Sequence, residues 1–196
     1  MKLLRALSLR RDKIWLQRGP VEEGFRRYWY TGWQWKVLPA TVDVALCPEV
    51  LPVADAFDRW CEKQGVPKAN HYIVTAYEDG QHSIRYHFDK ARSMDPKSLI
   101  VVVKLGTHGR PFAVRKRVDK KQQEKEPGIF RETLAPGTAV IMNMTGNLST
   151  QHAVPEVEDA GMSGSIVFRT IVDVIPPAQV EKELAKRGVK RQREEG

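Results

Sequence analysis

The feature that most constrains the fold of this chain is a succession of short strand-like segments that begins after Pro67. Each segment is rich in β-branched or aromatic residues and is bounded by turn signals, among them Asp79-Gly80, Pro136-Gly137 and Gly146-Asn147. Roughly eight strands at this spacing predict a mainly β fold, a jelly-roll barrel with flanking helices. The segments that we expect to be strands are 71–77, 83–88, 98–105, 111–117, 129–133, 139–143, 150–154 and 164–174.

The remainder of the chain flanks this barrel. A chain of 196 residues that is 41% hydrophobic can bury one core of ordinary size, so we expect one domain overall. It divides into an N-terminal extension (1–66), a barrel core (67–176) and a C-terminal part (177–196) with a short helix from Ala178 to Arg187 and a basic tail. Apolar residues at helical spacing predict an amphipathic helix over residues 53–64, with Cys61 on its apolar face as a buried structural thiol.

Charge and cysteine content limit the classes of binding partner and the cellular compartment that we expect. The formal net charge is +8, which favours a polyanionic partner, although a basic solvated surface needs none. Two cysteines form neither a disulfide framework nor a Cys-x-x-Cys motif, so we expect a reducing intracellular compartment, the cytoplasm or the nucleus. No apolar run approaches the roughly 18 residues of a membrane span. Basic residues gather around a strand and the loop after it, and the candidate substrate-binding residues among them are Arg110, Arg115 and Arg117.

Aromatic residues are concentrated near the N-terminus, on both sides of Thr31-Gly32. This arrangement predicts a tight hairpin with rings on both arms. The rings either pack on the core or form a platform on which a nucleobase stacks, with nearby basic residues available for phosphates. The candidate substrate-binding residues of the hairpin are Tyr28, Tyr30, Trp33 and Trp35.

A metal site is indicated by three residues of the strand-rich part. If residues 83–88 form a strand, His87 and Asp89 share one face of it. His152 lies in a later apolar strand and completes the two histidines and one carboxylate of a facial triad, the set that binds non-heme Fe(II). Arg169 follows and could pair with the far carboxylate of an organic acid. A hydrogen-bonded surface pair and a structural histidine are the alternatives, and His71, His82 and His108 are the remaining histidines.

In order and spacing, these residues resemble the double-stranded β-helix oxygenases that use Fe(II) and 2-oxoglutarate, and among them the AlkB family of nucleic-acid dioxygenases. The resemblance covers about residues 70–174. The segments that carry it are Tyr77-Glu78-Asp79-Gly80, Ser83 to Asp89, Leu105-Gly106, Arg110-Pro111-Phe112, Leu134-Ala135-Pro136-Gly137, Met142-Asn143, His152 with Pro155, and Val167-Phe168-Arg169.

The resemblance implies a double-stranded β-helix in which His87, Asp89 and His152 ligate iron. It places Tyr77 and Arg169 on 2-oxoglutarate, and the aromatic hairpin corresponds to the lid that grips a flipped base. O2 is the second co-substrate, and a base can reach the iron only when it is extruded or single-stranded. The implied activity is demethylation or hydroxylation of a methylated or modified base in DNA or RNA by a monomer.

This chain departs from the family pattern at three places. Thr75 stands where the family usually has an asparagine that contacts the co-substrate, and Ser163 stands where it has the first of two arginines. Lys90-Ala91-Arg92 replaces acidic residues that would favour a cationic methylated base. Three alternatives therefore stay open: a C-methyl hydroxylase of thymine or 5-methylcytosine, a hydroxylase of a basic protein, and a catalytically weak nucleic-acid-binding module.

Overall fold

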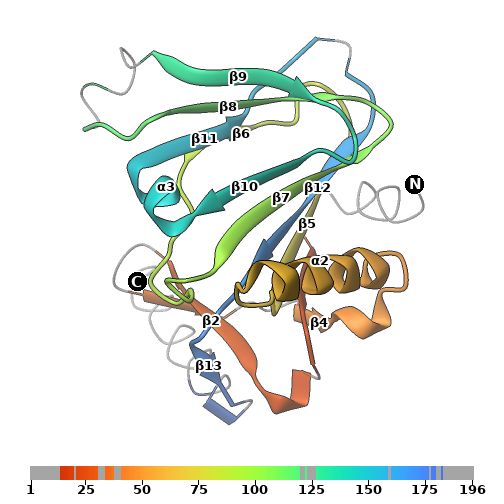
Figure 1. Cartoon of the computed structure of the whole chain (residues 1–196), viewed down its shortest axis with the longest axis vertical. Coiled ribbons are helices and arrows are strands. Elements are labelled where there is room, and N and C mark those ends of the chain that lie inside the picture. The colour runs from red at the N-terminus through yellow and green to blue at the C-terminus, as the bar shows by residue number, and fades with distance from the viewer. Residues whose placement is uncertain are drawn as a thin grey trace, which may run out of the picture.

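Two β-sheets face each other in the computed structural model of the chain (Figure 1). The structure describes residues 14–19, 21–30, 34–37, 41–119, 122, 127–158, 160–176, 178–179 and 182. The larger sheet has the strand order β10-β7-β12-β5-β1-β4, in which all neighbours are antiparallel except β1 and β4. Its strands are β10 (Ala139–Asn143), β7 (Leu99–Gly106), β12 (Ser163–Arg169), β5 (His71–Tyr77), β1 (Ile14–Gln17) and β4 (Thr41–Asp43).

The smaller sheet has the order β6-β11-β8-β9 and is antiparallel throughout. From β5 onward, the chain alternates between the two sheets, apart from the hairpin that joins β8 to β9. This double winding is the jelly-roll barrel that the strand pattern predicts, so the predicted fold class is confirmed. The strands of the smaller sheet are β6 (Ile84–His87), β11 (Thr150–Val154), β8 (Arg110–Lys116) and β9 (Gly128–Leu134).

Helix α2 (Leu51–Gln64) covers the outer face of the larger sheet (Figure 1). Side chains on that face, including Tyr72, Val101 and Phe168, form one buried cluster with the apolar side of the helix. The helix ends at Gly65, whose φ of 65° places it in the left-handed region that glycine tolerates. Cys61 is fully buried, and burial raises the pKa of its thiol to about 11, in agreement with a structural role.

Alternation along each strand separates this outer face from the barrel interior. Side chains at odd positions of β5 and β12 and at even positions of β7 point inward, toward the smaller sheet. Tyr77 of β5, for example, packs in one cluster with Phe112 and Val154 of the smaller sheet. The interior between the sheets therefore belongs to a different set of residues from the core beneath α2.

The N-terminal extension contributes more to the sheets than the sequence indicates. β1 and β4 were not predicted, yet they extend the larger sheet beyond β5. The predicted aromatic hairpin is present as the antiparallel pair β2 (Phe25–Tyr30) and β3 (Gln34–Val37), which a third strand, β13 (Val174–Ile175), joins through β2. The turn with Trp33 and the side chains of Tyr28, Tyr30 and Trp35 lie outside the described residues.

Two further segments differ from the prediction. The strand expected over residues 164–174 is split into β12 and β13, because residues 170–173 leave the sheet and Ile171 bridges to Met94 instead. The expected turn at Gly146-Asn147 lies inside a short helix, α3 (Met144–Ser149), and two 3-10 turns, η1 (Val21–Glu23) and η2 (Val44–Leu46), complete the elements. Most of the helix expected over residues 178–187 lies outside the described residues. None of the helices that are described has the length and apolar character needed to cross a membrane.

Candidate metal centre

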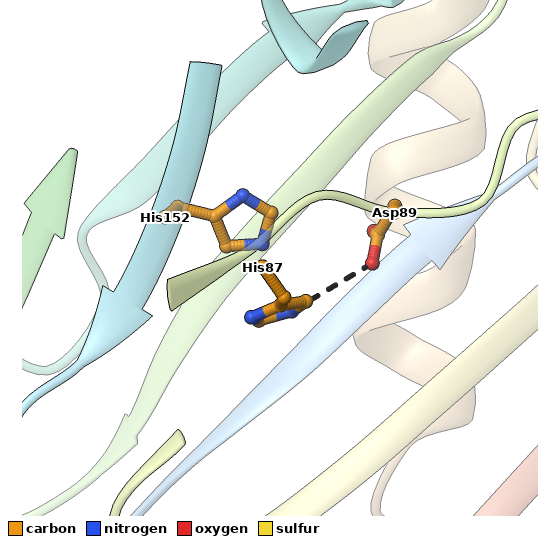
Figure 2. Close-up of side chains that lie close together, drawn as sticks. All are labelled: His87, Asp89 and His152. Carbon is orange, nitrogen blue, oxygen red and sulfur yellow. Dashed lines mark ion pairs between the residues drawn. The ribbon is translucent and has the colours of Figure 1, made fainter. Parts of the chain in front are cut away.

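The three predicted metal ligands converge at one end of the smaller sheet (Figure 2). His87 is the last residue of β6 and pairs in register with His152 of β11, while Asp89 lies two residues beyond the end of β6. One ligand atom from each residue lies within 4.8 Å of the other two. In the part of the chain that the structure describes, no other group of histidine, cysteine or acidic residues is arranged in this way.

A backbone carbonyl fixes the orientation of the His87 ring. Nδ1 of His87 lies 2.9 Å from the carbonyl oxygen of Arg85, which can only accept, so Nδ1 carries the proton. In the neutral ring this leaves Nε2 with its lone pair, and Nε2 lies 3.9 Å from Oδ1 of Asp89. This pattern, in which one ring nitrogen donates to a carbonyl and the other is free to ligate, is common among metal-binding histidines.

His152 is held between aromatic rings and is buried. Its ring centroid lies 4.3 Å from that of His87 and 5.7 Å from that of Phe112, on which it stacks. Burial, aided by the neighbouring His87, lowers the pKa of His152 to about 4, although Asp89 opposes the shift. His152 is therefore a neutral imidazole at neutral pH, which is the protonation state that a metal ligand requires.

Two side chains from distant parts of the chain hold Asp89. Nη2 of Arg169 donates to Oδ1 of Asp89 at 3.0 Å, and both side chains are buried. The Asn147 amide in α3 makes two bonds to the Asp89 backbone: its oxygen accepts from the N–H and its nitrogen donates to the carbonyl, each at 2.8 Å. Asn147 was not predicted, because a contact between residues that are 58 positions apart leaves no local sequence signal.

The predicted co-substrate residues face the same interior. Tyr77 is 1% exposed, its side chain is hydrogen-bonded to Ser165, and burial raises its pKa, so the phenol keeps its proton. Thr75 lies directly opposite Ser165 in the β5–β12 register. Arg169 lies on the same face of β12, beside the triad. The inward face of the larger sheet thus carries Thr75, Tyr77 and Arg169 in one continuous interior.

The three basic candidates lie on β8 or directly after it, and their surroundings differ. Arg110 is fully buried, and its guanidinium donates to the carbonyl oxygens of Asp79, Gly80 and His82. It holds the loop after β5 and is not at the surface, contrary to its assignment as a substrate contact. The other two pack over aromatic rings of the β6 segment: Arg115 lies 4.1 Å from the Tyr86 ring centroid and Arg117 lies 3.9 Å from that of Phe88.

The remaining described histidines, His71, His82 and His108, are not part of this group. Nδ1 of His82 accepts from the backbone N–H of Glu78, and His71 is buried with its ring 5.6 Å from that of Trp15. An apolar pocket of about 350 Å³, lined by residues of β8, β9 and β10, contains none of the three ligands. The ligand chemistry, and not a deep hollow, therefore locates the candidate site.

Comparisons with known proteins give the following picture. No protein-family model matches the chain, and no curated protein matches it. Among solved structures, it is similar to OsALKBH1 at 14% identity and a TM-score of 0.44, covering 68% of this chain and 66%, just under two thirds, of that chain. It is also similar to an oxidoreductase of the 2OG-Fe(II) oxygenase family from Burkholderia pseudomallei at 15% identity and a TM-score of 0.49, covering 89% of this chain and 80% of that chain.

Proposed function

We propose that the chain is an Fe(II)- and 2-oxoglutarate-dependent dioxygenase. The observation that carries this proposal is the convergence of His87, Asp89 and His152 with ligand atoms within 4.8 Å of one another. Two imidazoles and one carboxylate suit Fe(II) and leave positions open for a keto acid and O2. When bound, the iron would couple oxidative decarboxylation of the keto acid to succinate with oxidation of a C–H bond of the substrate.

The residues of the chain prepare this centre in specific ways. The Arg85 carbonyl sets the tautomer of His87, and the Asn147 amide fixes the backbone of Asp89. Arg169 brings a permanent positive charge beside Asp89, where a keto-acid carboxylate would arrive. Tyr77 offers a protonated hydroxyl farther along the same interior. The co-substrate would therefore be bound by Arg169 and Tyr77, with Thr75 as a further hydroxyl.

We further propose that the substrate is a methylated or modified base in DNA or RNA. The net charge of +8 supports a polyanionic partner. Arg115 and Arg117 support it as well, because they lie over the rings of the β6 segment whose end carries the metal ligands. The aromatic β2–β3 hairpin is the candidate for contacts to an extruded base, through Tyr28, Tyr30, Trp33 and Trp35.

Succinate release provides the direct test. Purified protein with Fe(II), ascorbate and 2-oxoglutarate is expected to release succinate faster when a methylated oligonucleotide is added, with a matching mass change in the nucleosides. The His87→Ala variant is expected to be inactive, whereas His82→Ala, which alters a described histidine outside the triad, retains activity. If the protein shows no turnover and no metal-dependent binding of 2-oxoglutarate, the proposed dioxygenase activity is ruled out. Turnover with a basic peptide but with none of the oligonucleotides would instead show that the substrate is a protein.

A further inference from the structure

A lysine inside the barrel has no anionic partner among the residues that the structure describes. Lys104 of β7 is 2% exposed, and its Nζ makes no hydrogen bond with any residue that the structure describes. This ammonium contacts the Tyr77 ring, whose centroid lies 5.5 Å from Nζ. Burial, together with a smaller effect of Arg110, lowers the pKa of Lys104 to about 8. An ammonium in this position is costly unless an anion joins it, so the site is prepared for a negatively charged ligand.

The strand register surrounds this ammonium with hydroxyl groups. Lys104 lies directly opposite Ser165 of β12, which in turn lies opposite Thr75 of β5. Two residues along the strands, Ser163 lies opposite Tyr77. The Ser163 hydroxyl is fully buried and has no hydrogen-bond partner among the described residues. One cation and several hydroxyl donors therefore face the same part of the interior, a set that matches a carboxylate.

The neighbouring buried cation is already bound to the loop after β5. Arg110 also lies near the Tyr77 ring, with its guanidinium carbon 5.4 Å from the centroid. Its two terminal nitrogens already donate to three backbone carbonyls of the loop after β5. Among the described residues, the Lys104 ammonium has no acceptor at all, whereas only Nε of the Arg110 guanidinium lacks one. An incoming carboxylate would thus pair with Lys104.

This position is connected to the metal centre through β12. Arg169, which pairs with Asp89, lies on the same inward face of β12 as Ser165, four residues away. At about 3.3 Å per residue, their Cα atoms are about 13 Å apart. The long side chains of Arg169 and Lys104, together with a short dicarboxylic acid, can span this gap. A keto acid held at the triad by one end would direct its other end toward Lys104.

We propose that Lys104, assisted by Ser163, binds the far carboxylate of the keto-acid co-substrate. This inference rests on the proposed function. The AlkB family, which the sequence resembles, usually has an arginine at the position of Ser163, and Lys104 would take over the charge of that arginine. A lysine from the adjacent strand β7 supplies the positive charge, and the small Ser163 side chain leaves room for the carboxylate. The chain would consequently prefer a dicarboxylic keto acid over a monocarboxylic one.

Ligand pairs that differ only at the far end provide the test. Under anaerobic conditions, Fe(II)-loaded protein is titrated with 2-oxoglutarate and with 2-oxopentanoate, in which a methyl group replaces the far carboxylate, and binding is followed calorimetrically. The wild type is expected to prefer 2-oxoglutarate by at least about 100-fold, the effect of a buried charge pair. Lys104→Met is expected to lose this preference while its affinity for 2-oxopentanoate changes by less than about threefold. Lys104→Arg retains part of the preference, and Lys97→Met, at an exposed position, retains all of it.

The outcomes separate this inference from the proposed function. A wild type that binds both keto acids equally, or a Lys104→Met variant that keeps the preference, would overturn the role of Lys104 and leave the dioxygenase proposal standing. A wild type that binds neither keto acid in the presence of metal would overturn both. Thermal unfolding of the metal-free protein is the second readout. Lys104→Met is expected to be at least as stable as the wild type, whereas a loss of stability would assign Lys104 a structural role and contradict the inference.

Discussion

At the scale of single residues, the candidate site depends on a side chain that is not itself a ligand. The buried Asn147 amide bonds to both the N–H and the carbonyl of Asp89. Asn147→Ala leaves both backbone groups without this partner, so we expect metal affinity to fall about 10- to 100-fold. Asn143→Ala is the matched control, because Asn143 caps α3 through the N–H of Gly146 and does not contact Asp89. Competition titrations with a chelating dye would measure both. Equal affinity in the two variants would contradict the positioning role.

The pair between Arg169 and Asp89 makes a prediction about stability. Both side chains are buried, so Arg169→Met removes a close positive partner of a desolvated carboxylate. We expect the metal-free protein to lose about 3 kcal/mol of unfolding free energy. A saturating divalent metal would recover much of this loss, because it gives Asp89 a new cation. Urea unfolding with and without metal would measure the difference, and the same loss under both conditions would argue against Asp89 as a ligand.

The pKa of Lys104 predicts a pH dependence. Its folded value of about 8 lies below its ordinary value of 10.5, so the unfolded chain binds more protons between these two values. The charged lysine therefore destabilises the fold below pH 8, by on the order of 3 kcal/mol, and this cost disappears as the pH rises toward 10.5. Lys104→Met is expected to exceed the wild type in stability at pH 7 and to approach it at pH 10. Denaturant unfolding of the metal-free proteins across this pH range measures the difference in unfolding free energy between the variant and the wild type. A difference that does not narrow between pH 7 and pH 10 would contradict the prediction.

At the scale of elements, two loops lock together next to the barrel. Gly80, in the loop after β5, accepts a hydrogen bond from the backbone N–H of Val157, and a Cβ at this position would lie 1.7 Å from the Val157 carbonyl oxygen. Gly80→Ala must therefore separate the loops, and we expect a loss of about 3 kcal/mol. Gly128→Ala is the control, because its added Cβ would meet only the Val114 carbonyl oxygen at 3.7 Å. Comparison of the two unfolding midpoints measures the effect, and equal midpoints would contradict it.

The sequence predicts well those elements whose signals are local. The core strands were recognised because alternation and turn residues set their bounds, and β5, β10 and β11 match the prediction residue for residue. β1 and β4 were missed because four and three residues carry too little pattern, and their parallel pairing depends on chain that is distant in sequence.

The same distinction between local and distant signals decides which residues of the site can be predicted from the sequence. His87 and Asp89 are close in sequence, and their spacing indicates a shared face. Lys104 ends a run of valines and reads as the polar end of a strand, whereas the register places it inside the barrel opposite Ser165. The basic stretch of sequence around Arg110 indicates a position at the surface, because no residue near it in the sequence shows that loop carbonyls enclose its guanidinium.

At the scale of the whole molecule, the charge distribution makes a prediction about nucleic-acid binding. The net charge of +8 gives the chain a general attraction for polyanions, but the proposed contact face is specific: the end of β8, where Arg117 lies over Phe88 beside the strand that leads to the triad. Lys116 and Arg117 are both exposed there. Lys63, exposed on α2, lies on the other side of the larger sheet and serves as the control.

Counterion release then sets the expected result for binding of a single-stranded oligonucleotide. Each phosphate contact contributes about 0.7 to the slope of log affinity against log salt, so Lys116→Ala/Arg117→Ala is expected to reduce the slope by about 1.4 and to weaken binding evenly across sequences. Lys63→Ala should leave the slope unchanged. Fluorescence anisotropy at several salt concentrations would measure all three proteins. If the double variant and the control shift the slope equally, the attraction comes from the net charge alone, and the β8 face does not direct nucleic acid toward the metal centre.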